Sequence, residues 1–260
     1  MLKILKYSFF DLIRSRWSYV YLLFYLLLGC VLLFLNNDLS KAVITMMNVI
    51  IILVPLIGTV FGVMYYYNSK EFTELLLAQP IKRSSIFIGQ YLGVAISLSM
   101  SLIIGLGIPF VLYGLFESNE IWDFILLLVT GTFLTLIFTA LAFNIALYNE
   151  NKIKGFSYSI LLWLFMAVIY DGLFLMSLVA FQSYPLDSFS IGATMFNPID
   201  LSRILILLKL DISALLGYTG AVFQKFFGTG FGLLISIGAL SLWVIIPVLN
   251  IYRKCRKKDF

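Results

Sequence analysis

Long apolar runs separated by short polar segments are the main pattern along this chain. Six of these runs are long enough for a helix to cross the hydrocarbon core of a membrane, which takes about 20 apolar residues. They cover Tyr19–Leu35, Val43–Tyr66, Ile86–Phe116, Phe124–Leu147, Phe156–Phe181 and Phe231–Ile251. The runs are continuous and do not alternate between apolar and polar positions as the strands of a membrane β-barrel do. The pattern therefore predicts an all-α integral membrane protein with six transmembrane helices in a single domain, residues 1–260.

The first 17 residues precede the first run and are amphipathic. Leu2, Leu5, Phe9 and Leu12 form an apolar helical stripe, and charged residues occupy most of the remaining surface. This spacing favours a helix that lies in the membrane interface and leads into the first span. The alternative is a basic extension of that span.

Glycine and proline positions indicate where helices bend or approach closely. The third run is longer than one straight crossing, and we expect a kink or break at its glycines and proline. Two pairs of glycines spaced four residues apart would allow close packing of helices. The residues concerned are Gly105, Gly107 and Pro109 in the third run, and the pairs Gly58 with Gly62 and Gly89 with Gly93.

The segment 182–230, between the fifth and sixth runs, is the largest region outside the predicted spans. Asn197 is a good N-cap, Pro198 suits a first helical position, and Asp200 complements the helix dipole. These residues predict a helix from Pro198 to about Leu210, and Asp211 would cap a second one that reaches toward Phe223. We expect two interfacial or re-entrant external helices. One further crossing would have to carry charged residues through the membrane.

Composition and charge agree with a membrane protein and suggest its orientation. The chain is 62% hydrophobic and 12% charged, with mean hydropathy +1.02 and a net charge of +5. Because Lys and Arg concentrate in cytoplasmic loops, both termini are expected in the cytoplasm of a bacterial inner membrane. The Lys and Arg residues are dispersed over several loops, and this distribution does not favour nucleic-acid binding. The side richer in basic residues holds Lys3, Lys6, Arg14, Arg16, Lys70, Lys82, Arg83, Lys152, Lys154, Arg253, Lys254, Arg256, Lys257 and Lys258, and the other holds Lys41, Arg203, Lys209 and Lys225.

Residues that carry enzyme chemistry are scarce. The chain has no histidine and two cysteines, so a zinc site or a histidine-based triad cannot be assembled within it. The G-x-x-x-x-G-K-[ST] phosphate loop is also absent. We therefore expect no catalytic residue, no bound metal and no bound cofactor in this chain.

Asp171 is the acidic residue that lies deep in a predicted span. An intramembrane carboxylate is costly unless it is protonated, paired or hydrated, which makes Asp171 a candidate for a transport path. The alternative is a protonated carboxyl group whose hydrogen bond to another helix fixes the packing. The sequence offers Asp171 no Lys or Arg partner within the spans.

The loop Asn68–Ser85 resembles the first cytoplasmic loop of ABC-2 type permeases, the membrane subunits of one class of ABC transporter. The resemblance rests on Glu74-Leu75-Leu76-Leu77-Ala78-Gln79-Pro80-Ile81-Lys82-Arg83-Ser84, and the chain departs from many members at Phe72, where they carry glycine. Glu74–Ala78 is predicted to form an amphipathic helix that ends before Pro80 and inserts Leu75, Leu76 and Leu77 into a partner. A helix lying on lipid without a partner is the alternative.

The resemblance implies that segment 67–85 and the loop from Tyr148 to Gly155 couple the chain to a cytoplasmic pair of ATPase subunits, which would bind the ATP and Mg. The implied coupling residues are Lys70, Glu71, Glu74, Leu75, Leu76, Leu77, Gln79, Pro80, Lys82, Arg83, Asn149, Glu150 and Lys152.

A narrower resemblance, to the NosY family of permeases in the ABC system that matures nitrous oxide reductase, rests on Phe196–Leu205 and Leu210–Phe223 together with Leu77-Ala78-Gln79-Pro80. It implies a homodimer that works with a separate ATPase and a periplasmic β-helical protein and, through that protein, with a copper chaperone or nitrous oxide reductase. The permease would support assembly of the copper–sulfur centre, by export of a sulfur species or by transmitting motion outward. The implied external contact residues are Asn197, Pro198, Asp200, Arg203, Lys209, Asp211 and Tyr218.

Two other functions remain open from the sequence. A generic ABC-2 exporter of lipid, glycan or drug would show ATPase activity stimulated by its substrate and would need no periplasmic partner. A secondary transporter or channel that uses Asp171 would give ion-coupled flux without ATP, but it would leave the charged loop Asn68–Ser85 without a role.

Overall fold

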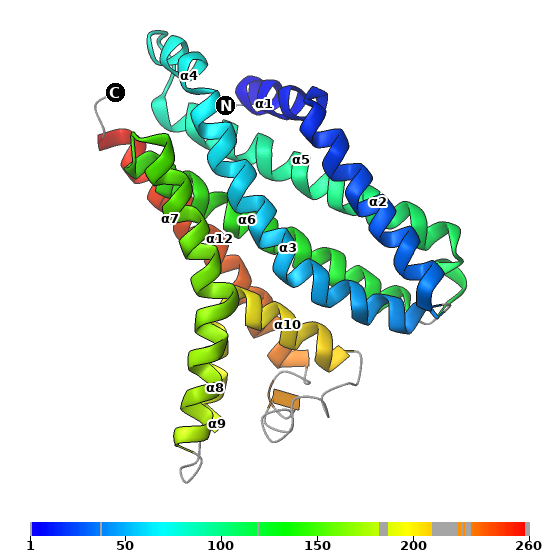
Figure 1. Cartoon of the computed structure of the whole chain (residues 1–260). Helices are drawn as coiled ribbons and strands as arrows, with labels where there is room; N and C mark the ends of the chain where they lie inside the picture. The colour runs from blue at the N-terminus through cyan, green and yellow to red at the C-terminus, as the bar shows by residue number, and fades with distance from the viewer. Residues whose placement is uncertain are drawn as a thin grey trace.

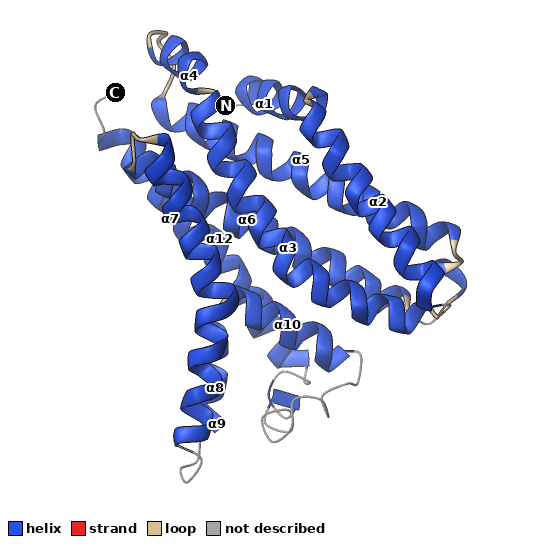
Figure 2. Cartoon of the chain, in the orientation of Figure 1, coloured by secondary structure: helices blue, strands red, loops and turns tan. Residues whose placement is uncertain are grey.

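The computed structural model describes residues 2–36, 38–118, 120–181, 187–209, 223–224, 226 and 230–257. Within these ranges the regular structure is helical, which confirms the all-α prediction (Figures 1 and 2). The elements in chain order are α1 (Leu2–Arg14), α2 (Arg16–Asn36), α3 (Leu39–Asn68), α4 (Lys70–Leu77), α5 (Arg83–Leu112), η1 (Leu115–Glu117), α6 (Ile121–Tyr148), α7 (Lys152–Leu164), η2 (Phe165–Ile169), α8 (Tyr170–Ala180), α9 (Asp187–Met195), α10 (Pro198–Lys209) and α12 (Gly230–Lys257).

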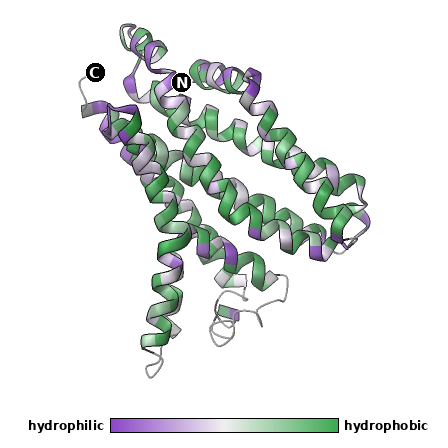
Figure 3. Ribbon diagram, viewed as in Figure 1, coloured by the Kyte–Doolittle hydropathy of each residue, from purple (hydrophilic) through white to green (hydrophobic). Residues whose placement is uncertain are grey.

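Six helical stretches in the described residues are long and apolar enough to span a membrane. They are Ser18–Asn36, Leu39–Asn68, Arg83–Leu112, Ile121–Tyr148, Lys152–Ala180 and Gly230–Arg256, and each one overlaps a predicted run. The fifth stretch combines α7, η2 and α8. Their surfaces are mainly hydrophobic, and hydrophilic residues gather at the end that holds α4 and the last turns of α12 (Figure 3). The chain is therefore a multi-pass membrane protein.

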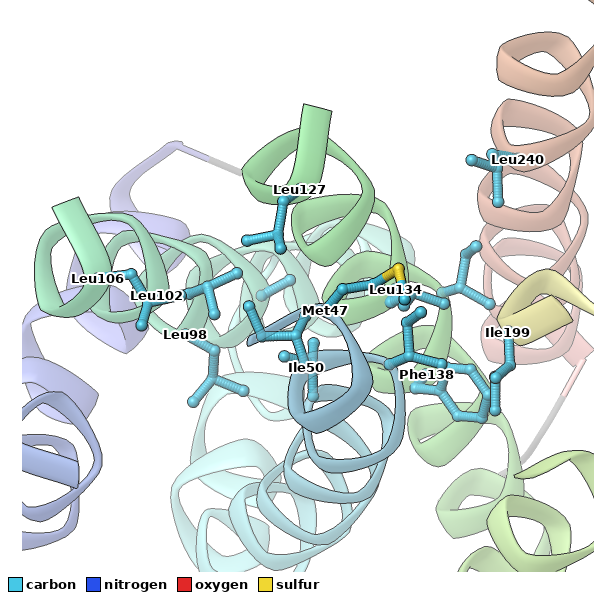
Figure 4. Close-up of a cluster of buried hydrophobic side chains, with 14 of the residues drawn as sticks. Met47, Ile50, Leu98, Leu102, Leu106, Leu127, Leu134, Phe138, Ile199 and Leu240 are labelled. Carbon is cyan, nitrogen blue, oxygen red and sulfur yellow. The ribbon is translucent and has the colours of Figure 1, made fainter. Parts of the chain in front are cut away.

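The core lies where α3, α5 and α6 pack together. Met47 and Ile50 of α3 meet Leu98 and Leu102 of α5 and Leu134 of α6, all of them buried (Figure 4). Within an apolar stretch of 18 residues in each span, 61% of residues are buried in the third span, against 11% in the fifth and 22% in the sixth. The fifth and sixth helices therefore leave most of their apolar surface for lipid or another subunit.

Both glycine pairs are sites of close helix packing, as predicted. A Cβ built on Gly62 of α3 would lie 2.9 Å from Cβ of Ala142 on α6, and one on Gly93 of α5 would lie 2.6 Å from Cβ of Ser8 on α1. Such separations are too short for two carbon atoms, so the absence of a side chain sets the approach of these helices.

Helix α1 forms as predicted, but its buried face is centred on Ile4, Ser8 and Leu12 and not on the stripe that includes Leu2, which is 81% exposed. The difference arises because α1 packs on α5 at Gly89 and Gly93. A small polar residue such as Ser8 fits that contact better than a large apolar one.

Helix α5 continues without interruption from Arg83 to Leu112, so of the predicted kink or break at Gly105, Gly107 and Pro109 the break does not occur. Pro109 lies near the end of the helix, where the missing N–H removes a single hydrogen bond. A Cβ on Gly105 would lie 2.7 Å from Cβ of Tyr25, and Gly105 therefore serves the packing of α2 on α5.

Helices α9 and α10 form a bent pair, with an angle of 116° between Ser188–Met195 and Pro198–Leu208. This geometry is that of a broken span or a re-entrant loop. The start of α10 at Pro198 confirms the prediction, and the Ile199 N–H donates to Oδ1 of Asn197 at 3.1 Å. Helix α10 is not a surface helix, because Ile199, Leu201 and Ile206 are buried against α3, α6 and α12. The predicted second helix, from Asp211 toward Phe223, lies outside the described residues apart from its end.

Candidate functional site

Helix α4 forms a short charged projection between two spans, at the same end of the molecule as α1 and the C-terminal part of α12 (Figure 1). It runs from Lys70 to Leu77, starting four residues earlier than predicted and ending before Pro80 as expected. We call its exposed residues together with those of the following turn the α4 surface. It comprises Lys70, Glu71, Glu74, Leu75, Ala78, Gln79, Pro80 and Lys82, and it continues to the exposed Arg83 at the start of α5.

The three leucines of α4 do not share one face, contrary to the prediction. Leu75 is 68% exposed, whereas Leu77 packs against the core and Leu76 is half-buried. Successive helical residues differ by about 100° in direction, so three in a row cannot all point outward. Leu75 is thus the apolar residue that α4 offers to a partner.

Two contacts fix α4 to the membrane helices. Phe72 stacks on Tyr7 of α1, with ring centroids 4.5 Å apart. Gln90 of α5 donates from Nε2 to Oγ1 of the buried Thr73 at 2.8 Å. Phe72 occupies the position where many ABC-2 type permeases carry glycine, and in this structure it packs on α1. These contacts join α4 directly to α1 and α5.

The loop between α6 and α7 is joined to the end of α3. The Tyr67 hydroxyl donates to the Asn149 carbonyl at 2.6 Å, and Lys152 Nζ donates to Asn68 Oδ1 at 3.1 Å. Gly155 leaves space for the Tyr67 ring, which a side chain at that position would overlap. The structure thus brings Asn149 and Lys152 together with the start of the α4 segment, while Glu150 lies exposed beside them.

Replacing Tyr67 with phenylalanine should loosen this junction without disturbing the core. The change removes the hydroxyl that donates to Asn149 and keeps the ring beside Phe156. A lost hydrogen bond of this kind costs about 1 kcal/mol, which corresponds to about fivefold faster local opening. Hydrogen exchange of residues 149–155 should accelerate by that factor. Replacement of the exposed Tyr158 should leave it unchanged, and equal rates in both variants would contradict the assignment.

A second polar group connects the fifth span with α10. Arg203 Nη1 lies 2.9 Å from Asp171 Oδ2 and 3.4 Å from Asp200 Oδ1. The side chains of Arg203 and Asp171 are 25% and 32% exposed. Asp171 therefore has a basic partner, and this partner comes from α10 and not from any of the six spans. The sequence did not indicate the pair because the segment that carries Arg203 was predicted to lie outside the bundle, whereas α10 packs against α3, α6 and α12.

Asn197 holds the bend between α9 and α10 against the fifth span. Its Nδ2 donates to the carbonyl of Met166 at 2.8 Å and to Asp200 Oδ2 at 2.7 Å. Met166 lies in η2, a π-helical turn in which the Tyr170 N–H bonds to the carbonyl of Phe165. Tyr170 in turn donates from its hydroxyl to the carbonyl of Ala193 at 2.6 Å. The π-turn and the bend are thus joined by two hydrogen bonds, one from each side.

The remaining predicted external residues have mixed outcomes. Asn197 and Asp200 are buried and make internal contacts, so their described positions offer no surface to a partner. Lys209 ends α10, and Asp211 and Tyr218 lie outside the described residues. Helix α4 lies at one end of the bundle, and α10 packs against α3, α6 and α12 in the other half (Figure 1).

Sequence reasoning missed Tyr67, Gln90 and Trp243, whose indole N–H donates to the carbonyl of Met195 at 3.0 Å. It also missed α9, although an aspartate at its first position is a common signal for a helix start. For the other three residues the signal was a polar or aromatic side chain inside a long apolar run or directly after it.

Comparison with known proteins identifies one relative of defined class. The chain is 26% identical over 179 residues to the probable ABC transporter permease protein NosY of Stutzerimonas stutzeri, and this match covers 67% of the chain. It extends over 58% of the length of that relative. No protein-family model matches the chain. The chain is thus similar to an ABC transporter permease, as the loop Asn68–Ser85 indicated.

Proposed function

We propose that this chain is the non-catalytic, membrane-spanning permease subunit of an ABC transporter and that a separate cytoplasmic ATPase docks on the α4 surface. The observation that carries the proposal is the projection of an amphipathic helix between two spans while Phe72 and Thr73 tie it to α1 and α5. A soluble motor needs such an element, because movement at an exposed helix must reach the membrane helices. The similarity to an ABC transporter permease supports the same function.

The proposed orientation places α4, the α6–α7 loop and both termini in the cytoplasm. These segments carry most of the basic residues of the chain, as cytoplasmic loops do. Their gathering at one end of the bundle supports this orientation (Figures 1 and 3). The large apolar surfaces of the fifth and sixth spans are consistent with a homodimer.

At a finer level, we propose that the transporter acts in maturation of the copper–sulfur centre of nitrous oxide reductase. The support is the resemblance of Phe196–Leu205 and Leu210–Phe223 to NosY permeases together with the similarity over 179 residues. In this proposal the chain transmits ATP-driven motion to a periplasmic β-helical protein or exports a sulfur species. Because Asn197 and Asp200 are internal, they would transmit movement of the fifth span and not contact the partner.

The alternative in which Asp171 carries ions loses its main argument, because that carboxylate is paired with Arg203.

An ABC permease and an ion carrier also differ in what the purified complex does. Gentle extraction of the tagged chain from its native membrane should recover an ATPase subunit and ATP hydrolysis. Deletion of the gene should leave nitrous oxide reductase without its copper–sulfur absorption, and the gene supplied in trans should restore it. Normal enzyme in the deletion strain would reject the finer proposal and leave the permease assignment in place.

A further inference from the structure

Two cavities of different polarity adjoin along α12. One, of about 1290 Å3, lies where the α6–α7 loop faces the last turns of α12. The other, of about 890 Å3, extends between α12, α6 and α9 and is lined mainly by apolar side chains such as Met195, Trp243 and Ile246. Asn250 and Arg253 line both cavities, so the polar space and the apolar groove are contiguous.

The polar cavity has a strong excess of positive charge. Lys154, Arg253, Lys254 and Arg256 line it together with a single acidic residue, Glu150. Lys254 lies over the ring of Tyr148, and the Arg253 side chain is exposed. A ligand that fits this cavity should carry negative charge and accept hydrogen bonds.

The dimensions of the groove match one leaflet of a membrane. The lining residues of α12 extend from Ala239 to Arg253, which corresponds to about 21 Å of helix at about 1.5 Å per residue. A bilayer with its headgroups is about 40–45 Å thick, so one leaflet measures about 20–22 Å. The apolar part therefore lies at the depth of the acyl chains, and the basic part lies at the depth of the headgroups.

We propose that these two cavities together bind one anionic phospholipid of the cytoplasmic leaflet, with its charged headgroup among the basic residues and an acyl chain along Trp243. The proposal rests on the orientation given under the proposed function. Basic pockets between helices at the cytoplasmic side are suited to anionic headgroups. A soluble protein could cover the basic cavity but could not reach the groove at membrane depth. A zwitterionic lipid would leave the excess positive charge unmatched.

Trp243 provides a probe within the groove. In the full chain, replacement of Trp17, Trp122 and Trp163 by phenylalanine leaves Trp243 as the single tryptophan. We expect phosphatidylglycerol with brominated acyl chains, added to the purified protein in neutral detergent, to quench its fluorescence. Because each of three basic residues should contribute about fivefold, brominated phosphatidylcholine should need a mole fraction about 100-fold higher for the same quenching. Substitution of Lys154, Arg253 and Arg256 by glutamine should remove this preference, and each single change should lower it about fivefold.

Matched variants separate the proposed site from general lipid contact. Lys3→Gln with Lys6→Gln removes two basic residues outside both cavities and should keep the preference for the anionic lipid. Gly192 lines the groove and has no heavy atom within 4 Å of a built Cβ, so Gly192→Leu should fill the groove and reduce quenching by both lipids. Gly172 has the same free space but does not line the groove, and Gly172→Leu should leave quenching unchanged.

Several results would overturn the proposal while leaving ATPase docking on α4 intact. They are equal quenching by both lipids, a preference that survives the triple glutamine variant, and protection of Trp243 from both lipids by a second copy of the chain. Binding of soluble glycerol 3-phosphate that leaves quenching by the anionic lipid unchanged would assign the basic cavity to a free phosphate compound and reject the lipid. Only variants whose circular dichroism shows the same helix content as the parent protein are compared, because this signal shows that they are folded.

Discussion

Leu75→Asp should abolish recovery of the ATPase subunit with the purified permease. Leu75 is the large apolar side chain that α4 exposes, and a carboxylate in the groove that receives it would lose its hydration without gaining a partner. Central apolar anchors of interfaces contribute about 2 kcal/mol or more, so the affinity should fall about 30-fold or more. Titration of purified ATPase against the permease in detergent, followed by light scattering or fluorescence anisotropy, measures the change.

The matched control for this experiment is Leu2→Asp. Leu2 is 81% exposed on α1, at the same end of the molecule, but it lies outside the α4 surface. It should leave the affinity unchanged. Since Leu77 packs against the permease core, Leu77→Asp should lower stability as well as binding, and the two effects can be separated by thermal unfolding. Undiminished affinity of Leu75→Asp would rule out α4 as the docking helix.

Arg203→Leu should destabilise the junction between the fifth span and α10 by about 2 kcal/mol. The substitution leaves the carboxylates of Asp171 and Asp200 facing each other without their shared cation. Breaking a fully buried pair costs about 3–5 kcal/mol, and the partial exposure of this pair reduces the cost. Thermal unfolding in detergent should show a lower midpoint, and ATP-driven transport should be lost in the assembled complex.

The double variant Arg203→Leu with Asp171→Leu separates the ion pair from the individual residues. If the two side chains act mainly through each other, the double variant should be more stable than Arg203→Leu alone. Additive losses of stability would show that the pair has little coupling energy. An Arg203→Leu variant as stable as the parent protein would show that Arg203 does not stabilise the contact between the fifth span and α10.

The number and the position of the spans could be predicted from the sequence because each run of about 20 apolar residues is by itself long enough to cross the hydrocarbon core as a helix. The start of α10 also followed, since Asn197 and Pro198 act locally. The ion pair did not, because Asp171 and Arg203 are 32 residues apart and belong to elements whose relative placement depends on packing. The prediction of which face of α4 is exposed failed for a similar reason, because the contacts of Phe72 and Thr73 with other helices decide which side of α4 faces the bundle.

The coupling surface was therefore predictable as a segment but not as a set of contacts. Its charged composition and Pro80 fixed its location and its end. The link from Tyr67 to Asn149 joins residues 82 positions apart. A single sequence carries no sign of such a contact, apart from a tyrosine at the end of an apolar run.

The π-helical turn at Phe165–Ile169 gives the fifth span a defined rotational phase. A π-turn holds one residue more than an α-turn, so its conversion to α-helix would rotate all of α8 by about 100° about its axis. That rotation would carry Asp171 away from Arg203. The hydrogen bond from Asn197 engages the carbonyl of Met166 within this turn and thereby opposes the change. The bent pair α9–α10 thus fixes the rotation of α8 about its own axis. This rotation decides the direction in which the side chains of α8 point.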